Sequence, residues 1–115
     1  MVDHTILHND EKEFLRRKDR NTLRLTGSAA IAACEQAANH NLSIGRIEGG
    51  LWLNPGFEER LDSIWTRAKA SSIDEIARNN LNGADFIRSE IRRIPEGLSE
   101  PANAFILTAS PIGED

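Results

Sequence analysis

The spacing of hydrophobic residues in the first half of the chain changes from a period of two, typical of a strand, to a helical period. Residues 22–26 alternate Leu23 and Leu25 with polar neighbours, which predicts a short, half-buried strand. From residue 27 to about residue 39 the apolar positions instead fall on one helical face, and most of them are alanine. We expect a helix there that packs closely on a sheet.

The next stretch, 42–48, reads LSIGRIE and changes face within itself. Leu42 and Ile44 share one side of a strand, whereas Ile47 falls on the other side. The pattern predicts either a strand buried on both faces or a bulge near Gly45 that switches the phase. Both interpretations make this strand a central one.

The hydrophobic pattern in the second half of the chain predicts three helices and a closing strand. The clearest amphipathic spacing runs from Phe57 to Ala68, after an Asn-Pro pair typical of a helix start. A second helix covers about 73–80 behind a capping box, a turn follows at Asn82-Gly83, and a third helix covers about 86–94. Residues 104–107 suit a buried strand.

These elements predict an α/β fold with three or four strands and helices packed against them, the strands pairing in parallel wherever a helix intervenes. The length of 115 residues fits one domain. We expect an α/β core over 22–110, a partly solvated N-terminal segment over 1–21 that contains a short helix, and a flexible tail over 111–115.

Composition narrows the class of protein. Hydrophobic residues make up 39% and charged residues 28%, as in a soluble globular protein. The longest apolar run, 29–34, is too short for a membrane span, and the N-terminus does not resemble a secretory signal. We therefore expect a cytoplasmic protein that does not enter a membrane.

Charge is distributed unevenly along the chain. The net charge is −4, of which residues 1–25 contribute +1 and residues 26–115 contribute −5. Phosphate backbones repel such an acidic body, so direct nucleic-acid binding is disfavoured, whereas attraction to a basic protein is allowed.

Catalytic and metal-binding motifs find little support. The single cysteine, Cys34, lies among small apolar residues and is predicted to be a core residue, out of reach of His40 as a catalytic base. His4 and His8 have a spacing suited to metal ligands on a helix, but neither a helix cap nor a carboxylate motif accompanies them. No phosphate-binding or nucleophile-elbow motif is present. We predict no catalytic residue, no metal and no cofactor.

One carboxylate stands inside an apolar run, IEGGLWL at residues 47–53. Glu48 is expected at the C-terminal end of the central strand, where open α/β sheets present ligands. Its structural interpretation is a strand-end residue that pairs with Arg46 on the same face. Catalysis and contact with a partner remain alternatives.

Acidic residues also gather in the predicted helices. Glu58, Glu59 and Asp62 are expected on one outer face, and further acids begin the next helix. Such residues are either solvated charges or a surface for a basic partner. Trp52 is either a core residue or an anchor of such an interface.

The chain resembles small acidic immunity proteins of bacteria in the alanine-rich helix SAAIAACEQAANHN, the strand ending SIGRIEGG, the amphipathic helix expected after it and the closing apolar strand. These proteins, of the contact-dependent inhibition and colicin types, bind a cognate toxin domain, often a basic nuclease. The resemblance implies a non-enzymatic inhibitor whose partner contacts include Glu48, Trp52, Glu58, Glu59 and Asp62.

Two other classes of function remain open. The chain could be an interaction subunit that self-associates through Trp52 or Trp65. It could also be a small ligand-binding domain or enzyme that uses Glu48 with Arg46 or His40. The sequence does not predict an oligomeric state.

Overall fold

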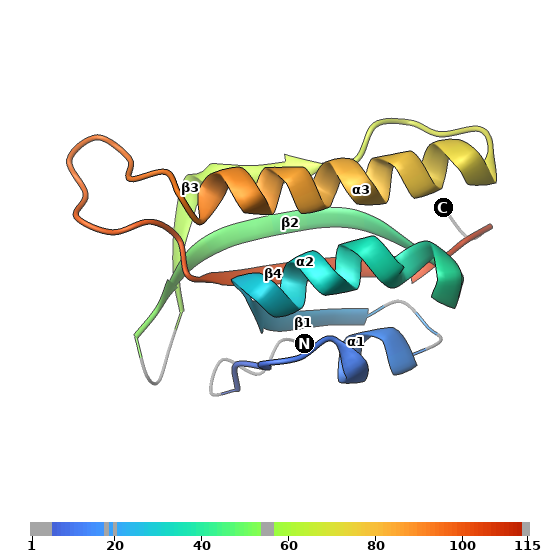
Figure 1. Cartoon of the computed structure of the whole chain (residues 1–115), viewed down its shortest axis with the longest axis horizontal. Coiled ribbons are helices and arrows are strands. Elements are labelled where there is room, and N and C mark those ends of the chain that lie inside the picture. The colour runs from blue at the N-terminus through green and yellow to red at the C-terminus, as the bar shows by residue number, and fades with distance from the viewer. Residues whose placement is uncertain (1–5, 18, 20, 54–56, 114–115) are drawn as a thin grey trace.

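The computed structural model describes residues 6–17, 19, 21–53 and 57–113 and arranges them in two layers (Figure 1). One layer is a four-stranded sheet of β1 (Asn21–Thr26), β2 (Leu42–Trp52), β3 (Phe57–Thr66) and β4 (Ala104–Pro111). The other layer holds the helices α1 (Lys12–Arg16), α2 (Gly27–Gln36) and α3 (Ile73–Glu90), with a short 3-10 helix, η1 (Ala37–His40). The predicted α/β class is confirmed, and of the three or four strands expected the sheet has four.

The strands lie in the order β1-β4-β2-β3, and all three neighbouring pairs are antiparallel. The prediction of parallel pairing across a helix is wrong. Helix α2 joins β1 to β2, but β4 lies between them; helix α3 joins β3 to β4, but β2 lies between them. Each helix therefore connects two strands that run in the same direction, and an antiparallel strand inserted between them takes the hydrogen bonds.

Strand β2 is a central strand, as predicted, and of the two alternatives for its pattern it shows the bulge. Ile44 pairs with Ala109 and Ile47 pairs with Leu107, with a register shift between residues 44 and 46. The extra residue at Gly45 returns Ile47 to the face that Ile44 occupies. Both isoleucines are fully buried, so the bulge keeps one side of β2 apolar along its length.

The segment after residue 56 is a strand and not the predicted helix. Phe57–Thr66 pairs with β2 from Trp52 back to Arg46, including Ile47 with Trp65. The apolar spacing fits a helix, but hydrogen bonding to the exposed edge of β2 decides the outcome, and Ile64, Trp65 and Thr66 also suit a strand. The Asn54-Pro55 pair that was to start the helix lies outside the described residues.

Helix α3 is continuous from Ile73 to Glu90, so the predicted turn at Asn82-Gly83 is wrong. A Cβ atom at position 83 would stand 3.0 Å from Ile47 Cδ1 and 3.4 Å from Trp65 Cη2. Glycine here serves close packing of the helix on the sheet and does not break the helix. The predicted helix start at Ser72 is confirmed, since the Ser72 hydroxyl accepts a hydrogen bond from the Glu75 amide at 3.1 Å as an N-cap does.

Both ends of the described chain contact the rest of the fold. Phe14 and Leu15 of α1 are buried in the core, and the His8 amide donates to the Arg24 carbonyl oxygen at 3.0 Å. Strand β4 continues to Pro111, and the Ile112 amide donates to the Asn41 carbonyl oxygen at 2.9 Å. Residues 111 and 112, which the sequence predicts to begin a flexible tail, thus pair with Leu42 and Asn41. The flexible tail stays a prediction, and residues 114–115 lie outside the described part.

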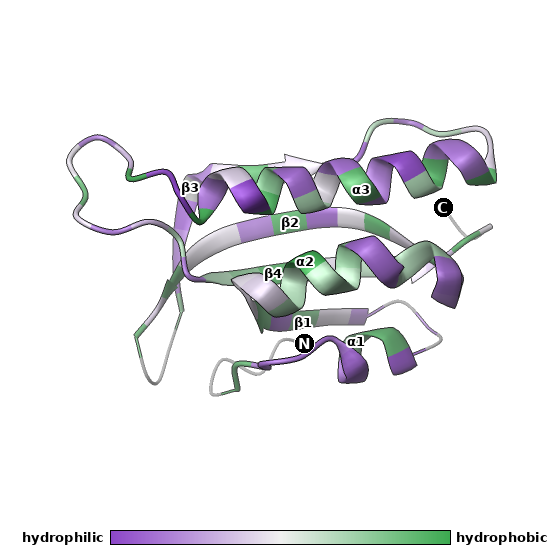
Figure 2. Cartoon of the chain, viewed as in Figure 1, coloured by the Kyte–Doolittle hydropathy of each residue, from purple (hydrophilic) through white to green (hydrophobic). Residues whose placement is uncertain are grey.

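The core lies between the sheet and the helices. Helix α2 is mostly apolar along its length and becomes hydrophilic towards its C-terminal end, whereas α3 alternates hydrophilic and apolar positions (Figure 2). The small side chains Ala29, Ala30 and Ala33 of α2 are buried and bring that helix close to the sheet. Among the helices described, none is both long enough and apolar enough to cross a bilayer.

Candidate partner-binding site

Both the β2–β3 hairpin and the loop before β4 lie at the left end of the molecule in Figure 1, with the loop above and the last residues of β2 below. Two hydrogen bonds join them: the Asn103 amide donates to the Gly50 carbonyl oxygen at 3.0 Å, and the Trp52 amide donates to Asn103 Oδ1 at 2.8 Å. We call this region, residues 51–53, 57–59 and 94–100, the hairpin end.

Exposed apolar side chains concentrate at the hairpin end. Leu53 and Ile94 are each 56% exposed, and Leu98 is 47% exposed. The described chain has three other large hydrophobic residues of comparable exposure, Ile6, Ile73 and Leu81, and none belongs to this region. Apolar side chains that a folded protein leaves in water at one place are typical of an interaction surface.

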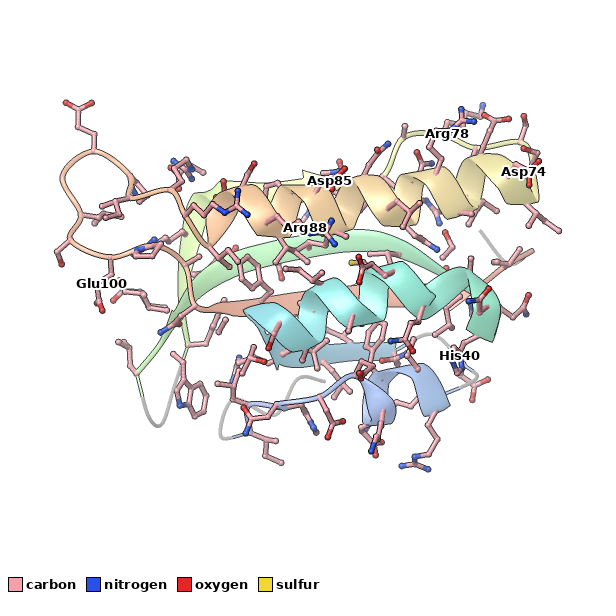
Figure 3. All side chains as sticks on the ribbon, in the orientation of Figure 1. His40, Asp74, Arg78, Asp85, Arg88 and Glu100 are labelled. Carbon is pink, nitrogen blue, oxygen red and sulfur yellow. The ribbon has the colours of Figure 1, made fainter. Side chains whose placement is uncertain are left out.

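Four exposed carboxylates accompany these apolar residues, namely Glu58, Glu59, Glu96 and Glu100. None of the four forms an ion pair with a described residue. Glu100 projects from the loop at the end opposite Asp74, which lies in the first turn of α3 (Figure 3). The hairpin end therefore presents carboxylates that form no ion pair within the described part of the chain.

Three predicted contact residues lie on β3, but they do not share one helical face as the sequence suggested. Glu58 pairs with Leu51 and Glu59 pairs with Gly50, so consecutive side chains point to opposite faces of the sheet. Asp62 lies further along the strand and accepts a hydrogen bond from Arg93 Nη1 at 3.2 Å. Glu58 and Glu59 belong to the hairpin end, whereas Asp62 holds β3 to the residues after α3.

Glu48 lies inside β2 and not at its end, since the strand continues to Trp52. Its Oε1 atom accepts a hydrogen bond from Arg46 Nε at 3.2 Å, as the structural interpretation predicted. Its register partners are Ile106 on β4 and Ile64 on β3. This places Glu48 on the sheet face away from α2 and α3, because the neighbouring residues Ile47 and Leu107 point into the core.

Trp52, also predicted as a contact residue, is half-buried at the base of the hairpin. The guanidinium carbon of Arg24 lies 5.4 Å from the centroid of its ring and 4.8 Å from the centroid of the Phe57 ring. No pattern in the sequence predicts this contact, because Arg24 alternates with leucines in β1 like any exposed strand residue. Trp65, the other tryptophan, packs against the core beneath α3.

The two glycines that follow Glu48 allow close approach of β3. A Cβ at Gly49 would stand 2.3 Å from Ser63 Oγ and 3.1 Å from Phe105 Cε1. Pairing between β2 and β3 shifts register between Glu48 and Gly50, at the place where these side chains cross. The glycines are therefore explained by packing within the hairpin.

A partly buried polar cluster joins β3 to the end of α3. The Ser63 hydroxyl donates to Glu90 Oε1 at 2.6 Å, and Arg93 Nη2 donates to the same oxygen at 2.7 Å. The hydrogen bond from Arg93, supported by that from Ser63, lowers the pKa of the Glu90 carboxyl, although burial acts in the opposite direction. A charged Glu90 therefore stabilises the base of the hairpin end.

The other residues considered for catalysis or metal binding are not brought together. Cys34 is buried, and burial raises the pKa of its thiol to about 12, whereas His40 is exposed. His8 takes part in a backbone bridge to Leu25, and His4 lies outside the described residues. In the part of the chain that the structure describes, no three His, Cys, Asp or Glu side chains gather as metal ligands would.

Comparison with known proteins finds a matching family and related proteins. The family described as Colicin-E5 Imm protein matches residues 23–110. The immunity protein CdiI of Burkholderia pseudomallei is 42% identical over 91 residues, which cover 78% of this chain and 76% of that protein. The colicin-E5 immunity protein of Escherichia coli is 34% identical over 87 residues, covering 75% of this chain and 96% of that protein.

Proposed function

This chain belongs to the family of colicin-E5 immunity proteins and so acts as a toxin-neutralising immunity protein; on that premise we propose that it binds its toxin through the hairpin end. The proposal includes a non-enzymatic mode of action in the cytoplasm, in which the immunity protein inhibits by occupying the toxin's surface. The cognate toxin domain would be basic and nuclease-like. A nuclease carries cations that bind phosphate backbones, and the carboxylates of the hairpin end are complementary to such cations.

One observation supports the proposal: exposed carboxylates and exposed apolar side chains occur together in segments at one end of the molecule. Glu58, Glu59, Glu96 and Glu100 are exposed without ion pairs among the described residues, and they lie in the segments that carry Leu53, Ile94 and Leu98. Interfaces of high affinity combine an apolar centre with complementary charge at the rim.

Complementary charge has a specific consequence for this chain. The body after residue 25 has a net charge of −5, so a basic partner is attracted from a distance and then oriented by the local carboxylates. Exposed charges act mainly on the association rate, whereas buried apolar contacts act mainly on the dissociation rate. The hairpin end supplies both kinds of group.

The test compares charge reversal at the two ends of the molecule. The partner that the tagged chain retains from its own cells is purified, and its binding to each variant is followed by surface plasmon resonance. Glu59→Lys and Glu100→Lys are compared with Asp74→Lys, which changes the net charge equally at the opposite end (Figure 3).

We expect Glu59→Lys and Glu100→Lys each to weaken binding by about tenfold or more, and Asp74→Lys to weaken it far less. Equal losses for all three variants would mean that only total charge matters, and the hairpin end would not be the site. A chain that retains no basic partner from its own cells would overturn the proposed partner class.

A further inference from the structure

Arg24 is a buried cation that connects the far edge of the sheet with the hairpin. It lies in the middle of β1, an edge strand separated from β2 by β4, and its side chain is only 1% exposed. Its register partner is Ile106, which in turn pairs with Glu48, so its side chain lies on the sheet face away from α2 and α3.

The guanidinium group reaches both strands of the hairpin. Its carbon lies 5.4 Å from the ring centroid of Trp52, the last residue of β2, and 4.8 Å from that of Phe57, the first residue of β3. A guanidinium is planar and weakly hydrated, and it stacks on aromatic faces with an attraction that strengthens when water is excluded. One side chain thus holds the two strands where the hairpin leaves the sheet.

The backbone at this point is shaped for the same contact. The Phe57 ring occupies the space that a side chain at position 50 would fill, since a Cβ there would stand 2.6 Å from Phe57 Cζ. The glycine therefore lets the Phe57 ring lie over β2, within reach of Arg24. The position of the ring depends on a backbone feature of β2 and on a cation from β1.

We propose that Arg24 is a positioning residue for toxin binding, which fixes the hairpin through the Trp52 and Phe57 rings without itself contacting the toxin. The inference rests on the proposed function, because it is the hairpin end that is held in place. A surface that is already ordered loses less conformational entropy on binding, so the complex dissociates more slowly.

The test removes the cation and keeps the volume. Arg24→Met lacks the charge and the planar group, and Arg46→Met is its matched control, because Arg46 lies on the same face but is exposed and ion-paired with Glu48. Binding to the co-purified toxin domain is measured by surface plasmon resonance, and amide hydrogen exchange of the free protein is measured by mass spectrometry.

For Arg24→Met we expect a dissociation rate raised by about tenfold and an unchanged dependence of the association rate on salt. Exchange should rise at residues 51–53 and 57–59 and remain as in the native protein in α3. Arg46→Met should match the native protein in both measurements. If Arg24→Met does not fold, Phe57→Leu removes one ring, keeps an apolar side chain and leads to the same expectations.

Native affinity for Arg24→Met would overturn the inference, and so would exchange that rises equally in α3 and in the hairpin, since that result indicates a role in global stability alone. Glu59→Lys in the same series separates the two proposals. If Glu59→Lys weakens binding and Arg24→Met does not, only the positioning role fails. If neither weakens binding, the hairpin end is not the binding site.

Discussion

Gly50 lies against the aromatic ring of Phe57, so that a Cβ at position 50 would stand 2.6 Å from Phe57 Cζ and 2.2 Å from the carbonyl oxygen of Glu58. The second of these atoms belongs to the backbone and cannot rotate away. We expect Gly50→Ala to lower the free energy of unfolding by about 1–3 kcal/mol, the usual range for added volume in a packed site.

Urea denaturation of Gly50→Ala measures this loss, and Gly45→Ala in the same strand is the control. A Cβ at Gly45 would be 3.7 Å from the Thr108 carbonyl oxygen, an ordinary contact distance. Gly45→Ala should therefore unfold within about 1 kcal/mol of the native protein. Equal stability of the two variants would contradict the close packing of β2 on β3.

Acid should weaken the cluster around Glu90. Because Arg93 lowers the pKa of Glu90 in the folded protein, with Ser63 adding to the effect, the charged carboxylate stabilises the fold above its unfolded pKa of about 4.3, and this contribution disappears as the pH falls through the folded pKa. Glu90→Gln should unfold about 1–3 kcal/mol more easily at neutral pH and lose less stability on acidification.

Thermal unfolding between pH 7 and about pH 3 tests this expectation. Glu58→Gln is the control, because Glu58 is exposed and has no ion pair among the described residues. Its acid dependence should follow that of the native protein. Parallel curves for Glu90→Gln and the native protein would exclude Glu90 as a source of the pH dependence.

Asn80 joins α3 to the first residues of β2. Its Oδ1 accepts from the Ile44 amide at 2.9 Å, its Nδ2 donates to the Leu42 carbonyl oxygen at 3.1 Å, and the side chain is 1% exposed. Asn80→Ala leaves two buried backbone groups without partners and should lower the free energy of unfolding by about 2–4 kcal/mol. Asn82→Ala, at an exposed position of the same helix, should change it by less than about 1 kcal/mol in urea denaturation.

Local sequence signals predicted the central elements of the fold well. The period-two pattern, which puts Ile44 and Ile47 on opposite faces, pointed to the bulge at Gly45. A glutamate three residues after Ser72 predicted the helix start at Ser72. The layout of these elements also led to the resemblance to immunity proteins, which the family match and the relatives confirm.

The elements that the sequence predicted wrongly depend on contacts between distant segments. The segment from Phe57 becomes a strand because β2 offers an edge, and Gly83 stays within α3 because Ile47 and Trp65 lie beneath it. Arg24 contacts Trp52 and Phe57, which are 28 and 33 residues away along the chain, and Asn80 bonds to Ile44 and Leu42, which are 36 and 38 residues away. The spacing of hydrophobic residues along the chain does not predict these contacts, because each contact depends on the order of the strands in the sheet. The partner contacts at Glu48, Trp52, Glu58, Glu59 and Asp62 stay predictions.

Two leucines of similar exposure lie at different places on the surface of the protein. Leu98 at the hairpin end is 47% exposed, and Leu81 on α3 is 49% exposed, so truncation of either removes a similar apolar surface from water. Neither change should lower the free energy of unfolding by more than about 1 kcal/mol, since neither side chain is in the core.

Binding to the toxin domain should distinguish them. We expect Leu98→Ala to raise the dissociation rate by about fivefold or more, because an apolar side chain near the centre of an interface loses its buried contacts, and Leu81→Ala to leave the rate unchanged. Surface plasmon resonance at two salt concentrations measures this, since an apolar effect persists at high salt whereas a charge effect declines. A larger loss for Leu81→Ala would move the binding surface from the hairpin end to the outer side of α3.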